Sequence, residues 1–375
     1  MKPRPTLTAT FTFLALASHA GAGINAVQGN LFDPDDVTTI LNSGNQFAPS
    51  GALFFDTDTL SATLNGNSLG TGELGIAANS TPFGVFAFSD ITLSAGVTVS
   101  ITGSRPFALL SRNNFSLGTN LSFSGSIGST GASGTTGTTG RRGTDNFSAG
   151  GDGGDGGDGG IGGTGGIGGL GSNGLSVVLI SQNTLTLSTS VSSSGGAGGA
   201  GGTGGTGGRG GNGGNGGGID RFTSRGGDGG RSGDGGDGGT GGTGGSGGMG
   251  GFITLAAPDI VLETQANLDA RGGMGGDGGS GGNPGESGFR GSPGFGGNYT
   301  SNGWPGTAGS SGLTGSDGSS GGIVLYSDSI TDGTSVSLAY SSEALPSEFN
   351  AVPEASTGIL AFLGSALLFR RRRRD

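Results

Sequence analysis

The chain has 375 residues, of which 95 are glycine and none is cysteine, and its formal net charge is -10. Without cysteine it forms no disulfide and offers no thiolate for catalysis. Seven of the 17 basic residues (Lys2, Arg4 and Arg370 to Arg374) and two of the 27 acidic ones (Glu354 and Asp375) lie near the termini, which leaves 10 basic and 25 acidic groups, a net charge of -15, on residues 23–353. Such an acidic chain repels nucleic acid and anionic membranes.

Residues 1–22 have the three parts of a secretory signal peptide. Lys2 and Arg4 form the charged start, residues 11–17 form a short apolar centre, and Ala20-Gly-Ala22 is an A-x-A cleavage site, with Ser18-His-Ala20 as the competing site. We therefore expect an exported mature protein that begins after Ala20 or Ala22.

The next segment, residues 23–82, is expected to form a strand-rich cap. From about residue 31 the apolar residues alternate with polar ones, and 52–55 and 60–64 have the pattern of strands between turn residues.

Residues 83–345 contain five copies of a unit of three short strands with polar corners. The copies are 85–88, 91–93 and 97–101; 107–110, 115–117 and 121–123; 177–180, 185–187 and 191; 252–255, 260–262 and 268; and 323–326, 330 and 336–338. One turn of a parallel β-helix needs such a unit, because stacked turns bury a continuous core. We predict an all-β protein built on a right-handed parallel β-helix. A β-sandwich also has short alternating strands, but its insertions would not all follow the third strand of a unit.

Three glycine-rich insertions, 128–172, 195–251 and 272–322, follow the third strands of units two, three and four. Each keeps a period of three in two arms around a tip that carries an aromatic residue (144–149, 219–225 and 298–302), with one slip at Ser232. The polyproline-II helix has three residues per turn and leaves its backbone groups unpaired within its own strand. The insertions therefore predict hairpins that form a polyglycine-II-like bundle. The alternative is a disordered low-complexity linker.

In such a bundle we expect two glycines of each triplet to face neighbouring helices and the third residue to point outward. Stacked units lie about 4.8 Å apart, so hairpins that leave the same corner emerge side by side at that spacing. The units would then hold the arms in register.

Two parts of the chain resemble known proteins. The interrupted units, with Gly103–Ser111 and Ala257–Ile260 at their junctions, resemble glycine-rich β-helix proteins of bacterial cell surfaces, a likeness that covers about residues 83–340 and implies no settled activity. At the C-terminus, a short motif, an apolar run at 358–369 and an arginine cluster look like a PEP-CTERM sorting signal. The motif residues are Val352, Pro353, Glu354, Ala355 and Ser356, and the cluster is Arg370, Arg371, Arg372, Arg373 and Arg374.

This second resemblance, over residues 346–375, implies processing by an exosortase in Gram-negative bacteria that export extracellular polysaccharide. The chain departs from the family at Ala355, where a second proline is usual. The apolar run is shorter than the roughly 20 residues that span a bilayer, which suits transient membrane insertion, and the arginines would hold the tail on the cytoplasmic side. An ordinary C-terminal membrane anchor is the alternative.

The residue inventory argues against an enzyme. The only histidine is His19 and the only lysine is Lys2, so the mature chain has no imidazole or lysine amine for acid–base or nucleophilic chemistry. Two sets of carboxylates are candidates for chemistry: Asp56 with Asp58, on one face of an expected strand, and Asp152, Asp155 and Asp158, which begin like a calcium-binding nonapeptide. A solvated turn explains the pair, and the period of three, in place of nine, argues against calcium. We expect no cofactor and no metal site.

These observations predict an exported structural protein of the cell surface or of the extracellular polysaccharide matrix. The second hypothesis is a polysaccharide-binding or adhesin module that displays hydroxyls in a regular row toward polysaccharide or ice. That row would comprise Thr203, Thr206, Thr240, Thr243 and Ser246. A polysaccharide-degrading enzyme is the third, since β-helices of that kind exist and would use paired carboxylates.

Overall fold

The computed structural model describes residues 24–28, 31–32, 36–42, 46–148, 151–219, 225–334, 340–346 and 349. Over these ranges the protein is all-β with almost no helix, which confirms the predicted class. The predicted signal peptide lies outside the described residues, and so do the sorting motif Val352–Ser356, the apolar run and the arginine cluster.

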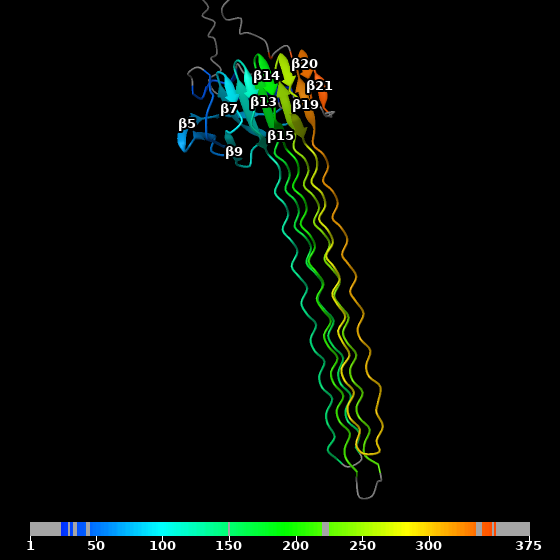
Figure 1. Cartoon of the computed structure of the whole chain (residues 1–375). Helices are drawn as coiled ribbons and strands as arrows, with labels where there is room; N and C mark the ends of the chain where they lie inside the picture. Colours follow the sequence, from blue (N-terminus) through cyan, green and yellow to red (C-terminus); the bar gives the residue numbers. More distant parts are fainter. Residues whose placement is uncertain are drawn as a thin grey trace, which may run out of the picture.

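The repeated units form parallel sheets that stack in register at one end of the molecule, which we call the head (Figure 1). Their first strands are β7 (Pro82–Phe88), β10 (Phe107–Ser111), β13 (Val177–Ser181), β16 (Ile253–Ala256) and β19 (Ile323–Tyr326). Their second strands are β8 (Ile91–Leu93), β11 (Phe115–Leu117), β14 (Thr184–Leu187), β17 (Asp259–Leu262) and β20 (Ser329–Asp332). The third strands of units two to four are β12 (Leu121–Ser122), β15 (Ser190–Ser192) and β18 (Asn267–Asp269).

Register places equivalent apolar residues above one another in the head. Phe107 pairs with Val177 in the first sheet, Phe115 with Leu185 in the second, and Leu121 with Val191 in the third. All belong to one buried cluster between the sheets. Because side chains alternate along a strand, this in-register stacking keeps one face of every strand in the core.

The N-terminal strands complete one end of the head by both parallel and antiparallel pairing. They are β1 (Ile24–Gln28), β2 (Leu31–Phe32), β3 (Ala52–Asp56), β4 (Ser61–Leu64), β5 (Asn67–Thr71) and β6 (Glu73–Ile76). β6 pairs antiparallel with β7, and β3, β4 and β5 form an antiparallel meander.

The ends of the repeat differ from the prediction. β9 (Thr98–Thr102), the third strand of unit one, pairs with β3 instead of stacking on β12, because the cap supplies it with a parallel partner. Residues 335–339, which include the third strand predicted for unit five, lie outside the described residues, and β21 (Ser341–Glu343) pairs with β19.

The glycine-rich insertions run away from the head as three long hairpins, side by side (Figure 1). We number their arms in chain order: arm 1 (125–146), arm 2 (151–174), arm 3 (194–217), arm 4 (226–251), arm 5 (271–297) and arm 6 (303–321). Backbone hydrogen bonds join arms 1, 3 and 5 into one layer and arms 2, 4 and 6 into a second. Further bonds join the layers, as in Gly205 N–H to the Gly163 carbonyl at 2.7 Å.

In arms 2, 3 and 4 the regular triplets use their three N–H groups in a fixed way, whereas arm 5, the last arm of its layer, keeps only the bonds to the other layer. The first glycine donates within its layer, as Gly198 does to Met274, and the second donates to the other layer, as Gly199 does to Gly169. The N–H of the third residue points to the outer face. Both glycines touch neighbouring backbone, so a Cβ at Gly198 or Gly199 would overlap the carbonyl oxygens of Gly245 and Ser129.

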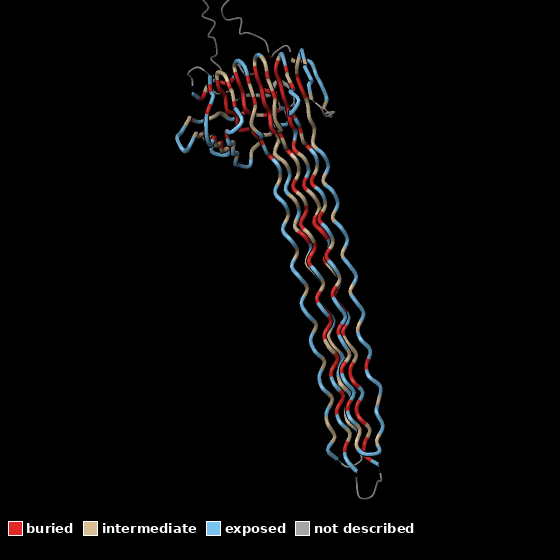
Figure 2. Tube along the Cα trace, viewed as in Figure 1, coloured by how far each residue is buried: buried red, intermediate tan, exposed pale blue. Residues whose placement is uncertain are grey.

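Glycine is kept only where a neighbouring arm exists. The two edge arms, 1 and 6, have one glycine per triplet, and the position that would face a further arm carries an exposed side chain. Those residues are Ser126, Ser129, Ala132, Thr135, Thr138 and Arg141 in arm 1 and Pro305, Ala308, Ser311, Thr314, Asp317 and Ser320 in arm 6. The expected two facing glycines per triplet therefore hold for arms 2, 3 and 4, apart from Ser172 and Ser232, and for arm 5 up to Gly282, but not for the distal half of arm 5 or for the edge arms. Figure 2 shows the same distribution, with buried residues concentrated in the inner arms.

The register of the head continues into both layers. Leu121 pairs with Val191 in the third sheet. The N–H groups of Phe123 and of Gly125, the first residue of arm 1, donate to the carbonyls of Ser192 and Ser194, which continues the same pairing into the arms. The second layer joins the first sheet in the same way, with Gly250 bonded to Ser319 just before Ile253 pairs with Ile323. The head and the bundle therefore share one hydrogen-bond lattice.

Candidate functional site: the faces and the tip of the bundle

The outward third residues form two faces on opposite sides of the bundle. Thr203 and Thr206 lie on the face of arms 1, 3 and 5, whereas Thr240, Thr243 and Ser246 lie on the face of arms 2, 4 and 6. The five hydroxyls predicted as one row are therefore divided between the faces. Neighbouring arms extend each row: the Thr203 hydroxyl bonds to Ser133 at 3.1 Å, and Ser316 bonds to Ser246 at 3.0 Å.

Near the head, the face of arms 2, 4 and 6 carries no charge. Its third residues there are Thr164, Ile167, Leu170 and Asn173 in arm 2, Thr240, Thr243, Ser246 and Met249 in arm 4, and Ser310, Leu313, Ser316 and Ser319 in arm 6. Farther out the same face becomes acidic, from Asp237 and Asp158 onward.

Aspartate and asparagine side chains at the third position accept hydrogen bonds from the outward N–H groups of neighbouring arms, which take no part in the backbone bonds between arms. Oδ1 of Asp152, Asp155 and Asp158 accepts the N–H of the residue beside it on arm 4, at 2.7, 2.7 and 2.9 Å. Asn212 and Asn215 do the same for Phe289 and Ser292 on arm 5, both at 3.0 Å. A short side chain with an oxygen acceptor is what this geometry requires. The three aspartates thus bridge arms, and no group of His, Cys, Asp or Glu able to hold a metal ion is found among the described residues.

Asp237 is the clearest of these bridges. Its Oδ1 accepts from the Thr307 N–H at 2.7 Å and from the Thr307 hydroxyl at 2.8 Å, and these bonds lower the pKa of Asp237.

We expect Asp237→Ala to speed hydrogen exchange at the Thr307 amide, and Asp237→Asn, which keeps the acceptor, to leave it nearly unchanged. Because the folded pKa lies below the unfolded value of about 3.9, this stabilisation is complete above that pH and is lost as pH falls through the folded pKa. Amide exchange measured by NMR on the parent, Asp237→Ala and Asp237→Asn chains, at pH values above and below about 3.9, checks the effect of the substitutions and the pH dependence. Equal rates in the alanine and asparagine variants would contradict the bridging role.

The carboxylate pair of the cap is also structural. Asp56 ends β3 and Asp58 lies in the following turn, in agreement with the turn favoured from the sequence over a shared strand face. Asp56 accepts from the N–H groups of Asp58 and Thr59, and Asp58 from the N–H and hydroxyl of Ser104. These bonds lower the pKa of both carboxyls. They fasten the β3–β4 turn to the chain after β9.

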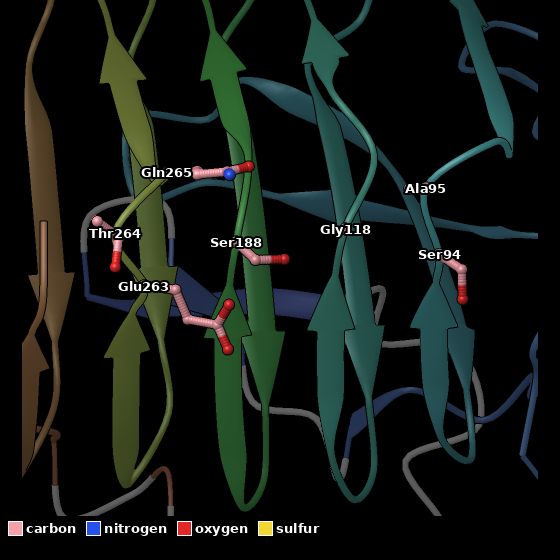
Figure 3. A pocket seen from close by; sticks show the side chains of 7 residues that line it. All are labelled: Ser94, Ala95, Gly118, Ser188, Glu263, Thr264 and Gln265. Carbon is pink, nitrogen blue, oxygen red and sulfur yellow. The ribbon is translucent and has the colours of Figure 1, made fainter.

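A shallow groove of about 500 Å³ crosses the corner after the second strands of the head (Figure 3). Its lining is Ser94, Ala95, Gly118, Ser188, Glu263, Thr264 and Gln265. Glu263 is the single carboxylate of this lining, whereas glycoside hydrolysis uses a pair. The groove therefore lacks the constellation that the polysaccharide-degrading hypothesis needs.

Except for Arg271, which pairs with Asp269 at 2.8 Å beside the head, the described arginines and the exposed aromatic side chains of the arms lie far from the head. Arg141, Arg142, Arg209, Arg225, Arg231 and Arg290 all lie in the distal parts of the arms, and three of them form ion pairs at 2.9 to 3.1 Å. The exposed aromatic residues of the described arms and turns are Phe147, Phe289, Phe295, Tyr299 and Trp304, also distal. The sequence showed that the tips carry aromatic residues, but not that Phe289, Phe295 and Trp304 join Tyr299 at the end of one hairpin.

A search for membrane spans, confined to the described residues, finds no helix long and apolar enough to cross a bilayer. The predicted apolar run at 358–369 lies outside those residues.

Comparison with known proteins places the chain in no family. No protein-family model and no curated protein matches it. Among solved structures, it is similar to a springtail antifreeze protein from Granisotoma rainieri, described as a bundle of nine polyproline type II helices whose crystal waters match the ice lattice, with 30% identity over 43% of this chain and 94% of that one. The TM-score is 0.09, so this likeness carries no argument.

Proposed function

We propose that the protein is an exported structural protein of the cell surface or of the extracellular polysaccharide matrix, in which a right-handed parallel β-helix carries a stiff polyglycine-II-like projection. The observation behind it is the continuous lattice: the strand register of the head runs on into both layers of arms. Right-handedness follows the general rule for connections between parallel strands.

The dimensions of the bundle suit a spacer. At about 3.1 Å per residue, arms of this length extend roughly 70 Å from the head. The inner glycines donate hydrogen bonds both within and between layers, so bending the bundle would break several bonds at once. The edge arms carry side chains where another arm would pack, which favours a projection of fixed width over open-ended growth.

Sorting is proposed from the C-terminal sequence. The motif Val352–Ser356, the apolar run and Arg370 to Arg374 would direct the chain through transient inner-membrane insertion to an exosortase-type enzyme in a Gram-negative-type bacterium. Mass spectrometry of the surface fraction should then find a C-terminus near Pro353. Recovery of chains that retain the arginine cluster would favour a permanent membrane anchor instead.

Polysaccharide binding is the second candidate, and the distribution of side chains on the bundle supports it. Uncharged hydroxyl and aliphatic residues cover the near half of one face, and exposed aromatic rings end the third hairpin. An enzyme is the weakest candidate, given the single carboxylate in the groove and the bridging roles of Asp152, Asp155 and Asp158.

A further inference from the structure

The end of the third hairpin carries four exposed aromatic rings: Phe289 and Phe295 are outward residues of arm 5, on the face of arms 1, 3 and 5, Tyr299 lies in the turn, and Trp304 is the outward residue that begins arm 6, on the face of arms 2, 4 and 6. Phe289, Phe295, Tyr299 and Trp304, which we call the aromatic tip, have exposed fractions of 66, 76, 62 and 74%. Large exposed aromatic side chains are expensive to leave in water, and they are over-represented where proteins bind partners. On the near parts of the arms the exposed large apolar residues are aliphatic, among them Ile161, Ile167, Leu170 and Leu313.

Two of the rings are held in place. The Arg209 guanidinium lies 4.6 Å from the centre of the Phe289 ring, and that of Arg290 lies 4.5 Å from the centre of the Tyr299 ring. Trp304 is fixed through its backbone, whose N–H bonds to Asp234 at 2.7 Å, and Pro305 follows it. Rings that are oriented before binding lose less conformational entropy when a ligand arrives.

The surroundings of the tip have nearly balanced charge, unlike the acidic chain as a whole. Arg225 pairs with Asp228 and Arg231 with Asp234, and the distal part of arm 5 adds one arginine, Arg290, and one glutamate, Glu286. This balance gives no electrostatic attraction for an anionic polymer or an anionic membrane. It fits a neutral ligand that offers apolar patches to the rings and hydroxyls to the paired charges.

We propose that the aromatic tip binds a neutral polysaccharide. Sugar rings present C–H groups on their faces, which pack on the electron-rich face of an aromatic ring, and their hydroxyls can bond to arginine and aspartate side chains. The position of the tip at the end of the bundle, away from the head, puts it where a matrix chain is met first (Figure 1). This inference rests on the proposed export of the protein and names the site for the polysaccharide-binding candidate.

The test uses the purified mature chain, so it does not depend on sorting. Its binding to cellulose and amylose would be compared with that of Tyr299→Ala/Trp304→Ala and of the matched control Ile127→Ala/Met274→Ala, which removes equally exposed apolar side chains from the near half of the bundle, on the face of arms 1, 3 and 5. We expect the aromatic variant to lose roughly tenfold or more in affinity, as stacked rings do elsewhere, and the control to bind like the parent. Unchanged hydrogen exchange in the arms would show that both variants fold.

Several results would overturn the proposal. These are failure of the parent chain to bind either glucan, equal binding by the aromatic variant, or loss of binding in the control as well. Tip-dependent binding to phosphatidylcholine vesicles without glucan binding would assign the rings to a membrane surface, and tip-dependent dimerisation in analytical ultracentrifugation without glucan binding would assign them to a second copy. None of these results depends on where the C-terminus is cut. The proposal of export and the proposal of polysaccharide binding at the aromatic tip can therefore be contradicted independently.

Discussion

Gly204→Val should destabilise the glycine bundle far more than Thr203→Val, the adjacent substitution in the same arm. A Cβ at Gly204 would overlap the carbonyl oxygen of Gly239 in the other layer, so arms 3 and 4 would have to separate. Separation endangers the bonds between these arms, such as those from the Gly239 N–H to the Gly205 carbonyl and from the Gly242 N–H to the Gly202 carbonyl, both at 2.8 Å. Each backbone group left buried without a partner costs about 1 to 3 kcal/mol.

Thr203 is the matched control because its side chain points outward. Valine there keeps the shape and loses only the exposed hydroxyl bond to Ser133. Thermal melting followed by circular dichroism, with hydrogen exchange over residues 195–217, would separate the two variants. Equal melting curves for Gly204→Val and Thr203→Val would indicate that the arms are a disordered linker.

The period of three predicted much of this architecture because polyglycine packing is local in sequence. The outward position tolerates Thr203, Arg209 and Asn212 alike, while glycine is fixed on either side, so the two kinds of position can be told apart by reading the chain. The stacked units were readable for a similar reason: apolar residues such as Phe115 and Leu185 recur at the same place in each unit.

What the sequence could not predict is which neighbour each segment would meet. The alternating residues of β9 suit any parallel partner, and only the folded cap shows that it is β3. The reason that arms 1 and 6 have fewer glycines also became visible only when they proved to be the edges of two layers. The aspartates looked like a metal motif because carboxylate ligands and N–H acceptors are the same residue type.

Ser232 interrupts the glycine repeat of arm 4, and the hydrogen-bond pattern on either side of it is kept. Ser232 occupies a facing position and is buried, and its hydroxyl accepts from the Gly303 N–H at 2.6 Å. Gly303 is the first residue of arm 6, so the serine lies where a new arm joins the layer and the regular bond from position 232 is replaced by a side-chain bond. The phase of three is kept on either side, as Gly230 and Gly233 both bond to arm 3.

We expect the head to act as the template of the bundle. Phe107 is fully buried, with its ring centre 5.2 Å from that of Phe55, 5.6 Å from Phe86 and 5.5 Å from Phe123. Phe107→Ala should lower the free energy of unfolding by about 3 to 5 kcal/mol, since it removes a large buried side chain and leaves a cavity.

If the shared register makes the head and the arms one cooperative unit, hydrogen exchange at the Gly125 and Gly198 amides should accelerate along with exchange in β10, although neither glycine touches the cavity. Phe147→Ala makes the same chemical change at a ring that is 92% exposed in the first hairpin, and it should leave both regions as they are. Exchange measured by mass spectrometry over the two regions gives the answer. Arms that stay protected while the head opens would mean that the glycine lattice, once formed, holds itself together without the strands that set its register.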